Sequence, residues 1–413
     1  MKTRVLLFFL LLNLGLPLFP QHFWQLSESG TIKNLNNVGF ISTETGIAVG
    51  DAGTIIYTSN GGVDWLPVAL GVSSDLRGVA FASNERVFAV GEMGTVLISE
   101  NHGQSWQQIF IPNVEYDLLD ISFDLASGRG VITGQTNAII VTSDFGETWT
   151  VVNDGYMSTF YGASMVNANM GIVVGWNSVF QPLLGYTLEW QTWDYQNFYP
   201  TWGGVMYEGL ARACKFTDEN HGFVVGTYFV PGGGFLAPFG GWSNNAWDAT
   251  DFPQPLTCID FKNSFGVIAG DNAYLAESQD GGLSWETISL NIGSSQLNDI
   301  KLIGNTGFIV GGGGIILKLI STVSVDETEI DGWKINCFPN PATNEIHVSV
   351  PFTDQAFTVS LSDISGSGKM EVPYKKENGL LTIRVADFPR GIYTLVVGNS
   401  EGRFCRKVVL MEK

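Results

Sequence analysis

A short apolar segment that ends in glycine recurs along most of the chain. The copies read GIAVG, VFAVG, GVITG, GIVVG, GFVVG, GVIAG and GFIVG, and they end at Gly50, Gly91, Gly134, Gly175, Gly226, Gly270 and Gly311. The intervals are 41, 43, 41, 51, 44 and 41 residues. Each copy is short and lacks a helical period, so each predicts a strand buried on both faces. A β-rich repeat near 40 residues is typical of a propeller blade and predicts a seven-bladed β-propeller.

A large apolar residue stands about ten residues before each of these glycines and predicts the preceding strand. These residues are Phe40, Phe81, Phe123, Met165, Phe216, Phe261 and Leu302. A second motif, S/T-x-D/N-x-G-x-x-W, follows four of the glycines as TSNGGVDW, SENHGQSW, TSDFGETW and SQDGGLSW. The motif places an Asn or Asp where it can cap the backbone amides of its own turn, and a glycine where a positive φ is needed.

These motifs resemble the Asp-box, or BNR repeat, of propellers. We interpret them as hairpins that stabilise blades, with a carbohydrate or metal site as the alternative. The residues concerned are Asn60, Gly62, Trp65, Asn101, Gly103, Trp106, Asp144, Gly146, Trp149, Asp280, Gly282 and Trp285. Two further copies, at Trp190 and Trp247, have lost the polar half of the motif.

The two ends of the repeat region complement each other. Trp24 lies 41 residues before Trp65, although no complete blade precedes it. The segment from Ile300 to Ile320 has three strands of a blade but no tryptophan after it. The segment around Trp24 is therefore expected to supply the outer strand of the last blade, which closes the ring and removes an unpaired strand edge.

The N-terminus and the cysteines indicate the cellular compartment. Residues 1–20 carry Lys2 and Arg4 before an interrupted apolar run, which predicts a secretory signal peptide, and no other segment is long and apolar enough to span a membrane. Cys214 and Cys258 begin equivalent strands and are expected to be buried free thiols. Cys337 and Cys405 flank the C-terminal segment, and their pairing is a weaker hypothesis.

The repeat ends near Ile320. Residues 321–335 are polar and acidic and predict a linker between a propeller of residues 21–320 and a separate module of residues 336–413. Alternating segments such as EIHVSV and FTVSLSDISG predict a small immunoglobulin-like antiparallel β-sandwich, so the whole chain is expected to be all-β.

The C-terminal motifs occur in a fixed order. They include Pro339, Asn340 and Pro341, then FPRGIYTLVV with Gly391 and Tyr393, and finally RKVVL. Together they resemble the type A sorting domain of the type IX (Por) secretion system of Bacteroidetes. The resemblance implies passage through the periplasm, recognition by the type IX machinery, and release or attachment at the cell surface. An ordinary adhesion module is the alternative.

Residues 22–320 most resemble the photosystem II stability and assembly factor-like family of BNR propellers, through their V-x-F, G-x-x-V-G and tryptophan motifs. The resemblance implies a binding scaffold. The fifth blade departs from the family pattern by two insertions, at 190–216 and 226–247, which topology is expected to place on one face.

These insertions are rich in aromatic residues, namely Trp193, Tyr195, Phe198, Tyr199, Trp202, Tyr207, Phe229, Phe235 and Phe239. As an exposed surface they predict a site for a protein or a glycan ligand; packed together, they form core instead. Arg77 and Arg212 stand four residues before Phe81 and Phe216 and are expected to point to the same face. They suit an anionic ligand, or else they form ion pairs at blade junctions with acidic residues such as Asp51, Glu92 and Asp271.

The sequence provides no motif for catalysis, and we predict neither a metal nor a cofactor. An extracellular glycoside hydrolase of the Asp-box type is the alternative function. Residues 21–320 hold 9 Lys and Arg against 28 Asp and Glu, so the acid is concentrated on the propeller and disfavours nucleic acid or anionic lipid as partners. The sequence therefore predicts a secreted propeller that binds an extracellular protein or glycan.

Overall fold

A computed structural model describes residues 22–410 except 70, 153–157, 189–191, 203–204, 231, 240, 242–245, 322–336, 339–341, 350–356, 364–369, 378–379, 387, 389–390 and 399–402. The predicted signal peptide and nearly all of the predicted linker lie outside the described residues. The chain divides into two compact units, one of which is Trp24–Ile320. The other contains the described residues after 321.

The larger unit is a β-propeller, as predicted, and its described residues form seven four-stranded sheets. The inner strands are β2 (Leu35–Phe40), β6 (Leu76–Phe81), β10 (Leu118–Asp124), β14 (Ser158–Met165), β20 (Gly209–Phe216), β25 (Leu256–Lys262) and β29 (Leu297–Ile303). The second strands are β3 (Gly46–Gly50), β7 (Val87–Gly91), β11 (Arg129–Gly134), β15 (Gly171–Asn177), β21 (Gly222–Tyr228), β26 (Phe265–Gly270) and β30 (Thr306–Gly311). All of the sequence repeats that end in glycine therefore form second strands.

The third strands are β4 (Thr54–Thr58), β8 (Val96–Ser99), β12 (Ile139–Thr142), β16 (Pro182–Thr187), β22 (Gly234–Pro238), β27 (Leu275–Ser278) and β31 (Ile316–Ser321). The outer strands are β5 (Leu66–Pro67), β9 (Gln107–Ile109), β13 (Thr150–Val151), β17 (Asp194–Asn197), β24 (Thr250–Phe252), β28 (Glu286–Thr287) and β1 (His22–Ser27). Short 3-10 turns η1 (Asp51–Gly53), η2 (Glu92–Gly94), η3 (Asp271–Ala273) and η4 (Gly312–Gly314) follow four of the second strands.

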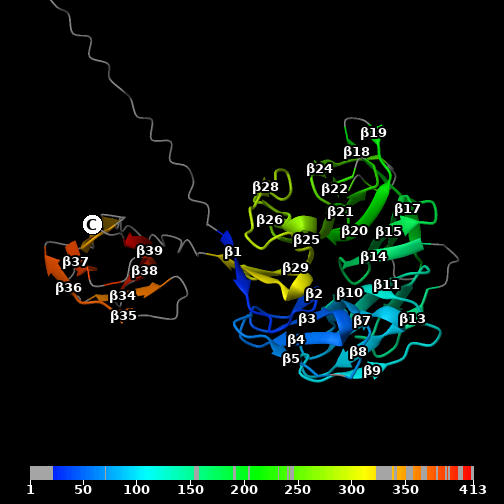
Figure 1. Cartoon of the computed structure of the whole chain (residues 1–413), viewed down its shortest axis with the longest axis horizontal. Coiled ribbons are helices and arrows are strands. Elements are labelled where there is room, and N and C mark those ends of the chain that lie inside the picture. Colours follow the sequence, from blue (N-terminus) through cyan, green and yellow to red (C-terminus); the bar gives the residue numbers. More distant parts are fainter. Residues whose placement is uncertain are drawn as a thin grey trace, which may run out of the picture. The chain divides into compact units, whose positions relative to one another are not determined.

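The sheets are arranged around a central axis. Figure 1 looks along this axis, with β2, β10, β14, β20, β25 and β29 near the centre and β5, β9, β13, β17 and β28 at the rim. Each inner strand contacts the inner strand of the next sheet, and β29 contacts β2. The sheets therefore form a closed ring.

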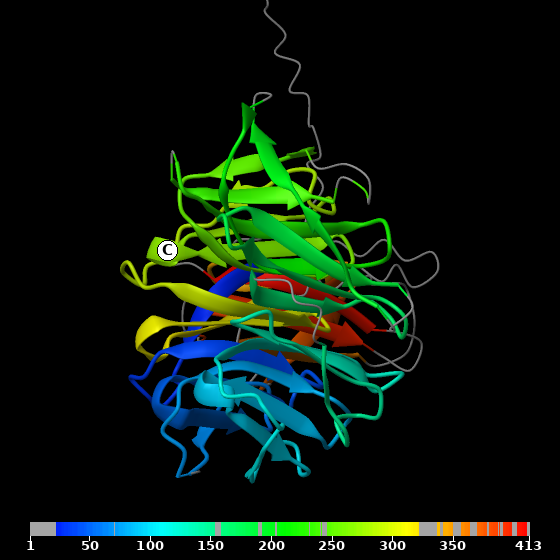
Figure 2. The same cartoon turned by 90° about the vertical axis from the view of Figure 1, so that its right-hand side faces the viewer.

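The N-terminal strand completes the last sheet, which confirms the predicted closure. The strand order in that sheet is β1-β31-β30-β29, and the blue and yellow segments lie next to each other in Figure 2. Trp24 of β1 donates its indole N–H to Glu277 of the preceding sheet at 2.7 Å. Ser27 donates to the carbonyl oxygen of Gly62 in the following sheet at 2.9 Å. One strand thus connects three sheets across the point where the ring closes.

The recurring terminal glycine has a steric cause. The strand that opens each blade brings a backbone carbonyl oxygen close to this glycine, as Asn34 does to Gly50. A Cβ atom on the glycine would lie 1.9 to 2.3 Å from that oxygen in all seven sheets. Any side chain would force the two strands apart, and this explains why glycine recurs at the end of every second strand.

The tryptophan hairpins, which are the four S/T-x-D/N-x-G-x-x-W segments, have the predicted local geometry. In one of them, Thr142 Oγ1 accepts the Gly146 N–H at 3.0 Å and Asp144 Oδ1 accepts the Thr148 N–H at 3.0 Å. The same two bonds recur in the other three hairpins. Trp149 then packs edge-on against Phe88 of the preceding sheet, with ring centroids 5.5 Å apart. The hairpins therefore cap their own turns and pack neighbouring blades together.

The fifth sheet decides between the two alternatives for some of the insertion aromatics. Its second-to-third strand turn spans only residues 229–233, and Phe235 lies in β22 with its side chain fully buried. Phe198 is also fully buried, and Trp247 stacks on it with ring centroids 4.3 Å apart. Of the two alternatives for these aromatics, the packed one therefore holds for Phe198 and Phe235, because their rings form a hydrophobic core.

The two insertions also pair with each other. The strands β18 (Tyr199–Trp202), β19 (Val205–Met206) and β23 (Ala246–Asp248) form a separate sheet, in which β18 and β23 run parallel. Since β23 follows β22, it lies between the third and the outer strand. Residues 226–247 therefore contain the second-to-third strand turn, but the strand β23 of this insertion lies beyond it.

The smaller unit contains two four-stranded antiparallel sheets, in agreement with the predicted sandwich. One has the order β32 (Cys337–Phe338), β33 (Glu345–Ser349), β37 (Leu380–Arg384) and β36 (Tyr374–Glu377). The other has the order β35 (Met370–Glu371), β34 (Thr358–Asp363), β38 (Gly391–Gly398) and β39 (Arg403–Leu410). Ile346 and Ile383 from one sheet share a core with Leu361 and Leu395 from the other.

Adjacent glycines of one hairpin provide a matched test of blade packing. Both Gly281 and Gly282 have positive φ, but a Cβ on Gly281 meets nothing within 4 Å, whereas one on Gly282 would lie 2.5 Å from the ring of Phe223 in the preceding sheet. We expect Gly281→Ala to cost about 1 kcal/mol of unfolding free energy, from backbone strain alone. Gly282→Ala should cost about 2 to 4 kcal/mol, measured by denaturant unfolding. Equal costs would contradict packing between blades at this hairpin.

Candidate ligand-binding pocket

Every inner strand of the propeller carries a β-bulge near its start. The register between inner and second strands skips one residue in each sheet. The skipped residues are Asn36, Arg77, Leu119, Tyr161, Arg212, Thr257 and Asn298. A bulge redirects the side chain of its extra residue, and here the same redirection occurs once in each sheet.

All seven bulge residues line one cavity, which we call the axial pocket. Its volume is about 730 Å³. The remaining lining residues are Asn34, Asp51, Glu92, Asp117, Gln135, Gln296 and Gly312. The prediction that Arg77 and Arg212 point to the same face is therefore confirmed, together with Asp51 and Glu92. Asp271, predicted to join them, is not among the described residues that line the pocket.

Three polar bulge residues are used to join blades. Asn298 donates to the carbonyl oxygen of Leu35, and Asn36 donates to that of Leu76, both at 2.8 Å. Thr257 donates in the same way to the carbonyl oxygen of Leu297. Each bond links one sheet to the next, so these three side chains stabilise the fold and are not available to a ligand.

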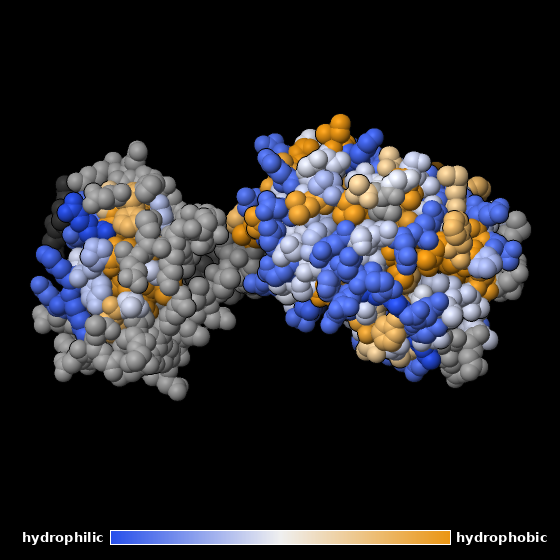
Figure 3. Space-filling view, turned by 90° about the horizontal axis from the view of Figure 1, so that it is seen from below, coloured by the Kyte–Doolittle hydropathy of each residue, from blue (hydrophilic) through white to orange (hydrophobic). Residues whose placement is uncertain are grey.

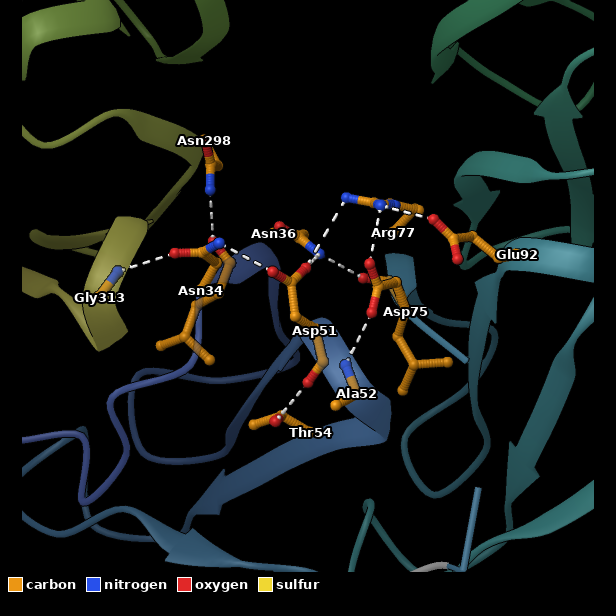
Figure 4. Close-up of polar contacts among 12 residues, drawn as sticks. Asn34, Asn36, Asp51, Ala52, Thr54, Asp75, Arg77, Glu92, Asn298 and Gly313 are labelled. Carbon is orange, nitrogen blue, oxygen red and sulfur yellow. Dashed lines mark hydrogen bonds and ion pairs between the residues drawn. The ribbon is translucent and has the colours of Figure 1, made fainter. Parts of the chain in front are cut away.

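Arg77 forms ion pairs with acidic residues at a blade junction, which was one of the two alternatives predicted for it. Its guanidinium lies 2.7 Å from Glu92, 3.0 Å from Asp75 and 3.8 Å from Asp51. Figure 4 shows these contacts together with the bonds that Asp51 accepts from Asn34 and Asn36. Arg77 is thus paired with carboxylates from two adjacent sheets.

Arg212 has a different environment. Its guanidinium carbon lies 4.8 Å from the ring centroid of Tyr161, the bulge residue of the preceding sheet, which is within the range of a cation–π contact. Among the described residues it forms no ion pair with a carboxylate. The axial pocket therefore presents one arginine whose positive charge is not neutralised, held in place by an aromatic ring.

Charged side chains also line a second cavity, of about 230 Å³, between the inner strands, which we call the channel. Lys215 binds Asp260 at 2.8 Å, and Lys301 lines the same cavity with Asp120 and Asp299. The pKa of Lys215 is raised because Asp260 lies beside it. Burial opposes the ionisation of Asp260, but Lys215, Lys301 and the Leu302 N–H hold its pKa below its usual range.

Asp120 and Asp299 connect sheets from within this channel. Asp120 accepts the Ala163 N–H at 2.8 Å, and Asp299 accepts the Val38 N–H at 2.9 Å. Burial raises the pKa of Asp120 to about 7, although the Ala163 N–H opposes the shift. Burial likewise raises the pKa of Asp299 to about 8, and the negative charge of Asp120 adds to the effect. Both residues are half-buried.

The predicted aromatic ligand residues lie elsewhere, and none of their described side chains lines the axial pocket. Trp193 and Tyr195 pack against the core cluster around Phe160. Tyr207 packs against Tyr228 with ring centroids 5.2 Å apart. Tyr199 is half-buried in β18, and the side chain of Trp202 lies outside the described residues. Their role in ligand binding stays a hypothesis.

Sequence reasoning missed Tyr161, but the sequence contains the signal. Tyr161 stands four residues before Met165, the same offset that relates Arg77 to Phe81 and Arg212 to Phe216. Applied to the remaining sheets, that offset identifies the rest of the bulge residues. A bulge at a fixed place in each inner strand explains why the offset is constant.

The remaining predictions concern single residues. Cys214 and Cys258 are buried free thiols, as predicted, and burial raises the pKa of both. Pro339, Asn340 and Pro341 and the side chains of Cys337 and Cys405 lie outside the described residues. In the predicted sorting motif, Gly391 begins β38, and Tyr393 of the same strand is buried against Phe388.

Two protein families match the chain. Residues 17–114 and 241–324 match the family described as photosynthesis system II assembly factor YCF48. Residues 336–411 match the secretion system C-terminal sorting domain. The chain combines a YCF48-like propeller with a C-terminal sorting domain. The unmatched part of the propeller, residues 115–240, includes Tyr161, Arg212 and the insertion that contains β18 and β19.

Solved structures support the fold of the YCF48-like propeller. A structure titled "YCF48 bound to D1 peptide" is 21% identical, covers 71% of this chain and 96% of its own, and has a TM-score of 0.57. YCF48 from Cyanidioschyzon merolae is 18% identical, with 71% and 98% coverage and a TM-score of 0.55. The WD40 propeller domain of Doa1 is 11% identical, with 73% and 99% coverage and a TM-score of 0.53. No curated protein matched the sequence.

The sorting domain indicates secretion to the cell surface or outside the cell, and it implies the type IX secretion machinery as a partner. The described part of the chain contains no helix with the length and apolar character needed to cross a membrane. On one side of the YCF48-like propeller, hydrophobic residues lie scattered among hydrophilic ones (Figure 3).

The channel carboxyls predict a pH dependence of stability. Because Asp120 and Asp299 have folded-state pKa values above those of the unfolded chain, the folded state binds more protons, and stability falls as pH rises from about 4 to about 8. Each group contributes at most about 1.4 kcal/mol per pH unit, and less because both residues are only half-buried. Denaturant unfolding of the YCF48-like propeller between pH 6 and 9 should show this fall.

Asp299→Asn should reduce the fall between pH 6 and 9, because asparagine does not titrate and only Asp120 of the pair remains. Asp194→Asn, at an exposed position, serves as the control and should leave the slope unchanged. The slope is compared, since the substitution also removes one acceptor oxygen and so changes stability by a constant amount. A slope as steep in Asp299→Asn as in the original chain would show that this carboxyl does not contribute to the pH dependence.

Proposed function

We propose that the propeller binds an extended polypeptide segment in the axial pocket and that Arg212 binds an acidic group of that segment. The observation that carries the proposal is the state of Arg212, which lines the pocket, contacts Tyr161 and has no carboxylate partner among the described residues. A planar guanidinium in this state is suited to a carboxylate, because it offers two parallel N–H donors.

The division of the pocket wall supports the same reading. Asn36, Thr257 and Asn298 are occupied by bonds between sheets, and Arg77 is neutralised by acidic residues. The side of the pocket formed by Tyr161 and Arg212 is therefore the part that we expect to contact a ligand. The ligand in the related structure titled "YCF48 bound to D1 peptide" is a peptide, which supports a polypeptide as the ligand class.

The net charge of the propeller adds selectivity. Residues 21–320 carry 19 more acidic than basic residues, so an anionic partner is repelled except where a basic residue stands alone. Arg212 provides such a place. We propose that the partner is met outside the cell, after export of the chain by way of the periplasm.

The glycoside hydrolase alternative requires two opposed carboxyl groups that are available for acid and base chemistry. Three described carboxylates line the axial pocket. Asp51 and Glu92 bind Arg77, and Asp117 accepts the Met93 N–H at 3.0 Å. These contacts do not favour hydrolysis at this pocket.

The proposal predicts that Arg212→Gln lowers affinity without loss of folding. A display library of random 12-residue peptides, selected on the whole chain, should yield binders that require Asp, Glu or a free C-terminal carboxylate. Loss of one charge-assisted contact should weaken the selected peptides by about 10- to 100-fold. Isothermal titration calorimetry measures the affinity, and thermal unfolding should shift little.

Arg77→Gln is the matched comparison, because Arg77 lines the same pocket but is paired. Its loss leaves Asp51, Asp75 and Glu92 uncompensated, so its larger effect should be on unfolding. The proposed function fails if no peptide is selected, or if Arg212→Gln binds the selected peptides as tightly as the original chain does.

A further inference from the structure

An exposed aromatic cluster lies on the fourth and fifth sheets and combines Phe229, which the sequence had singled out, with Trp176 and Phe180, which it had not. Trp176 contacts Phe180 with ring centroids 4.5 Å apart, and Phe229 lies 6.4 Å from Trp176 and 6.1 Å from Phe180. Phe180 is 52% exposed and Phe229 is 41% exposed. We call this cluster the aromatic notch.

The notch opens on a cavity of its own. Its volume is about 350 Å³, large enough for an aromatic side chain. The lining residues are Thr136, Ser158, Thr159, Trp176, Asn177, Ser178 and Phe180. The rings provide the apolar surface, and the hydroxyl and amide groups surround it with polar contacts, as in small-ligand sites.

Trp176 departs from the repeat at a position that is polar or glycine in most blades. The residue after the closing glycine is Asp51, Glu92, Gln135, Asp271 or Gly312 in five other sheets. The indole Nε1 of Trp176 is shielded from solvent and has no hydrogen-bond partner among the described residues. A shielded donor without a partner is costly, as it is for the indole N–H groups of Trp65 and Trp149.

The turn that carries Phe180 is held firmly in place. Asn177 Oδ1 accepts the N–H groups of Val179 and Gln181, both at 3.0 Å. Phe180 has a φ of 62°, a left-handed conformation that is unfavourable for a bulky residue. The turn therefore holds an exposed ring in a strained backbone conformation, which is a common feature of binding sites.

The notch adjoins the axial pocket. Thr136 lines the notch and its neighbour Gln135 lines the pocket. Thr159, which pairs with Trp176, lines the notch, and Tyr161 two residues later lines the pocket beside Arg212. Two residues of a strand span about 7 Å, so one extended segment can reach both cavities.

We propose that the aromatic notch receives a large apolar side chain of the same polypeptide segment whose acidic group binds Arg212. This inference rests on the proposed function and specifies its ligand as a segment with an acidic group and a Phe, Tyr, Trp or Leu side chain a few residues apart. The apolar side chain contacts the rings of Trp176 and Phe180, which line the cavity.

The test begins with a neutral probe, N-acetylphenylalaninamide, which does not depend on Arg212. Titration of the whole chain, followed by the NMR signal of the Trp176 indole N–H, should show saturable millimolar binding. Phe180→Asn should weaken it at least about fivefold, and asparagine tolerates the positive φ, so folding is preserved. Phe110→Asn is the matched control, because Phe110 is 84% exposed and lies in another sheet. Arg212→Gln should leave probe binding unchanged.

The selected 12-residue peptides provide the second arm. Replacement of their apolar residue by Ala should weaken binding to the original chain about tenfold and have little effect on Phe180→Asn. The proposal is overturned if the probe does not bind, or if Phe180→Asn binds probe and peptides like the original chain. Retained dependence on Arg212 in that case would leave the proposed function intact. If the probe binds but the peptides bind Arg212→Gln as tightly as the original chain, both the proposed function and the proposal that one segment occupies both cavities are overturned.

Discussion

The propeller depends on bonds between neighbouring inner strands, in which a side chain of one sheet binds the backbone of the next. Asn37, Asp120 and Asp299 accept backbone N–H groups across three of the junctions, and Asp260 does so across a fourth. Inner strands of a ring diverge as they leave the axis and cannot form a continuous ladder, so side chains take over the hydrogen bonds that the backbone loses. Sheets held in this way keep a fixed spacing around the axis.

The same constraint produces the pocket. The bulge at the start of each inner strand brings a carbonyl oxygen against the closing glycine and turns one side chain toward the axis. Some of these side chains serve the junctions, as Asn36 and Asn298 do. Tyr161 and Arg212 instead contact each other, and among the described residues neither donates a hydrogen bond to a carbonyl oxygen of a neighbouring sheet. The bulge is thus repeated around the whole ring, but at Tyr161 and Arg212 its side chain does not form the hydrogen bond that joins neighbouring sheets.

How far the sequence predicts this structure depends on whether a feature is local. The closing glycines, the hairpin that ends at Trp149 and the pairing of β1 with β31 follow from spacing and turn chemistry, and the structure agrees. The burial of the aromatic residues in the fifth sheet could not be predicted from local sequence. Phe198 and Trp247 are far apart in sequence and meet only because two insertions pair in parallel. The environment of Arg212 likewise depends on a ring supplied by the preceding sheet.

The central claim is that the ring is held closed by its first strand, and hydrogen exchange tests it most directly. A chain starting at His22 is compared with one starting at Glu28, which lacks Trp24 and its bond to Glu277. The account predicts that the shorter chain loses amide protection in β31 and at the junction of β29 with β2, with a lower unfolding midpoint. Unchanged protection of β31 in the shorter chain would contradict it.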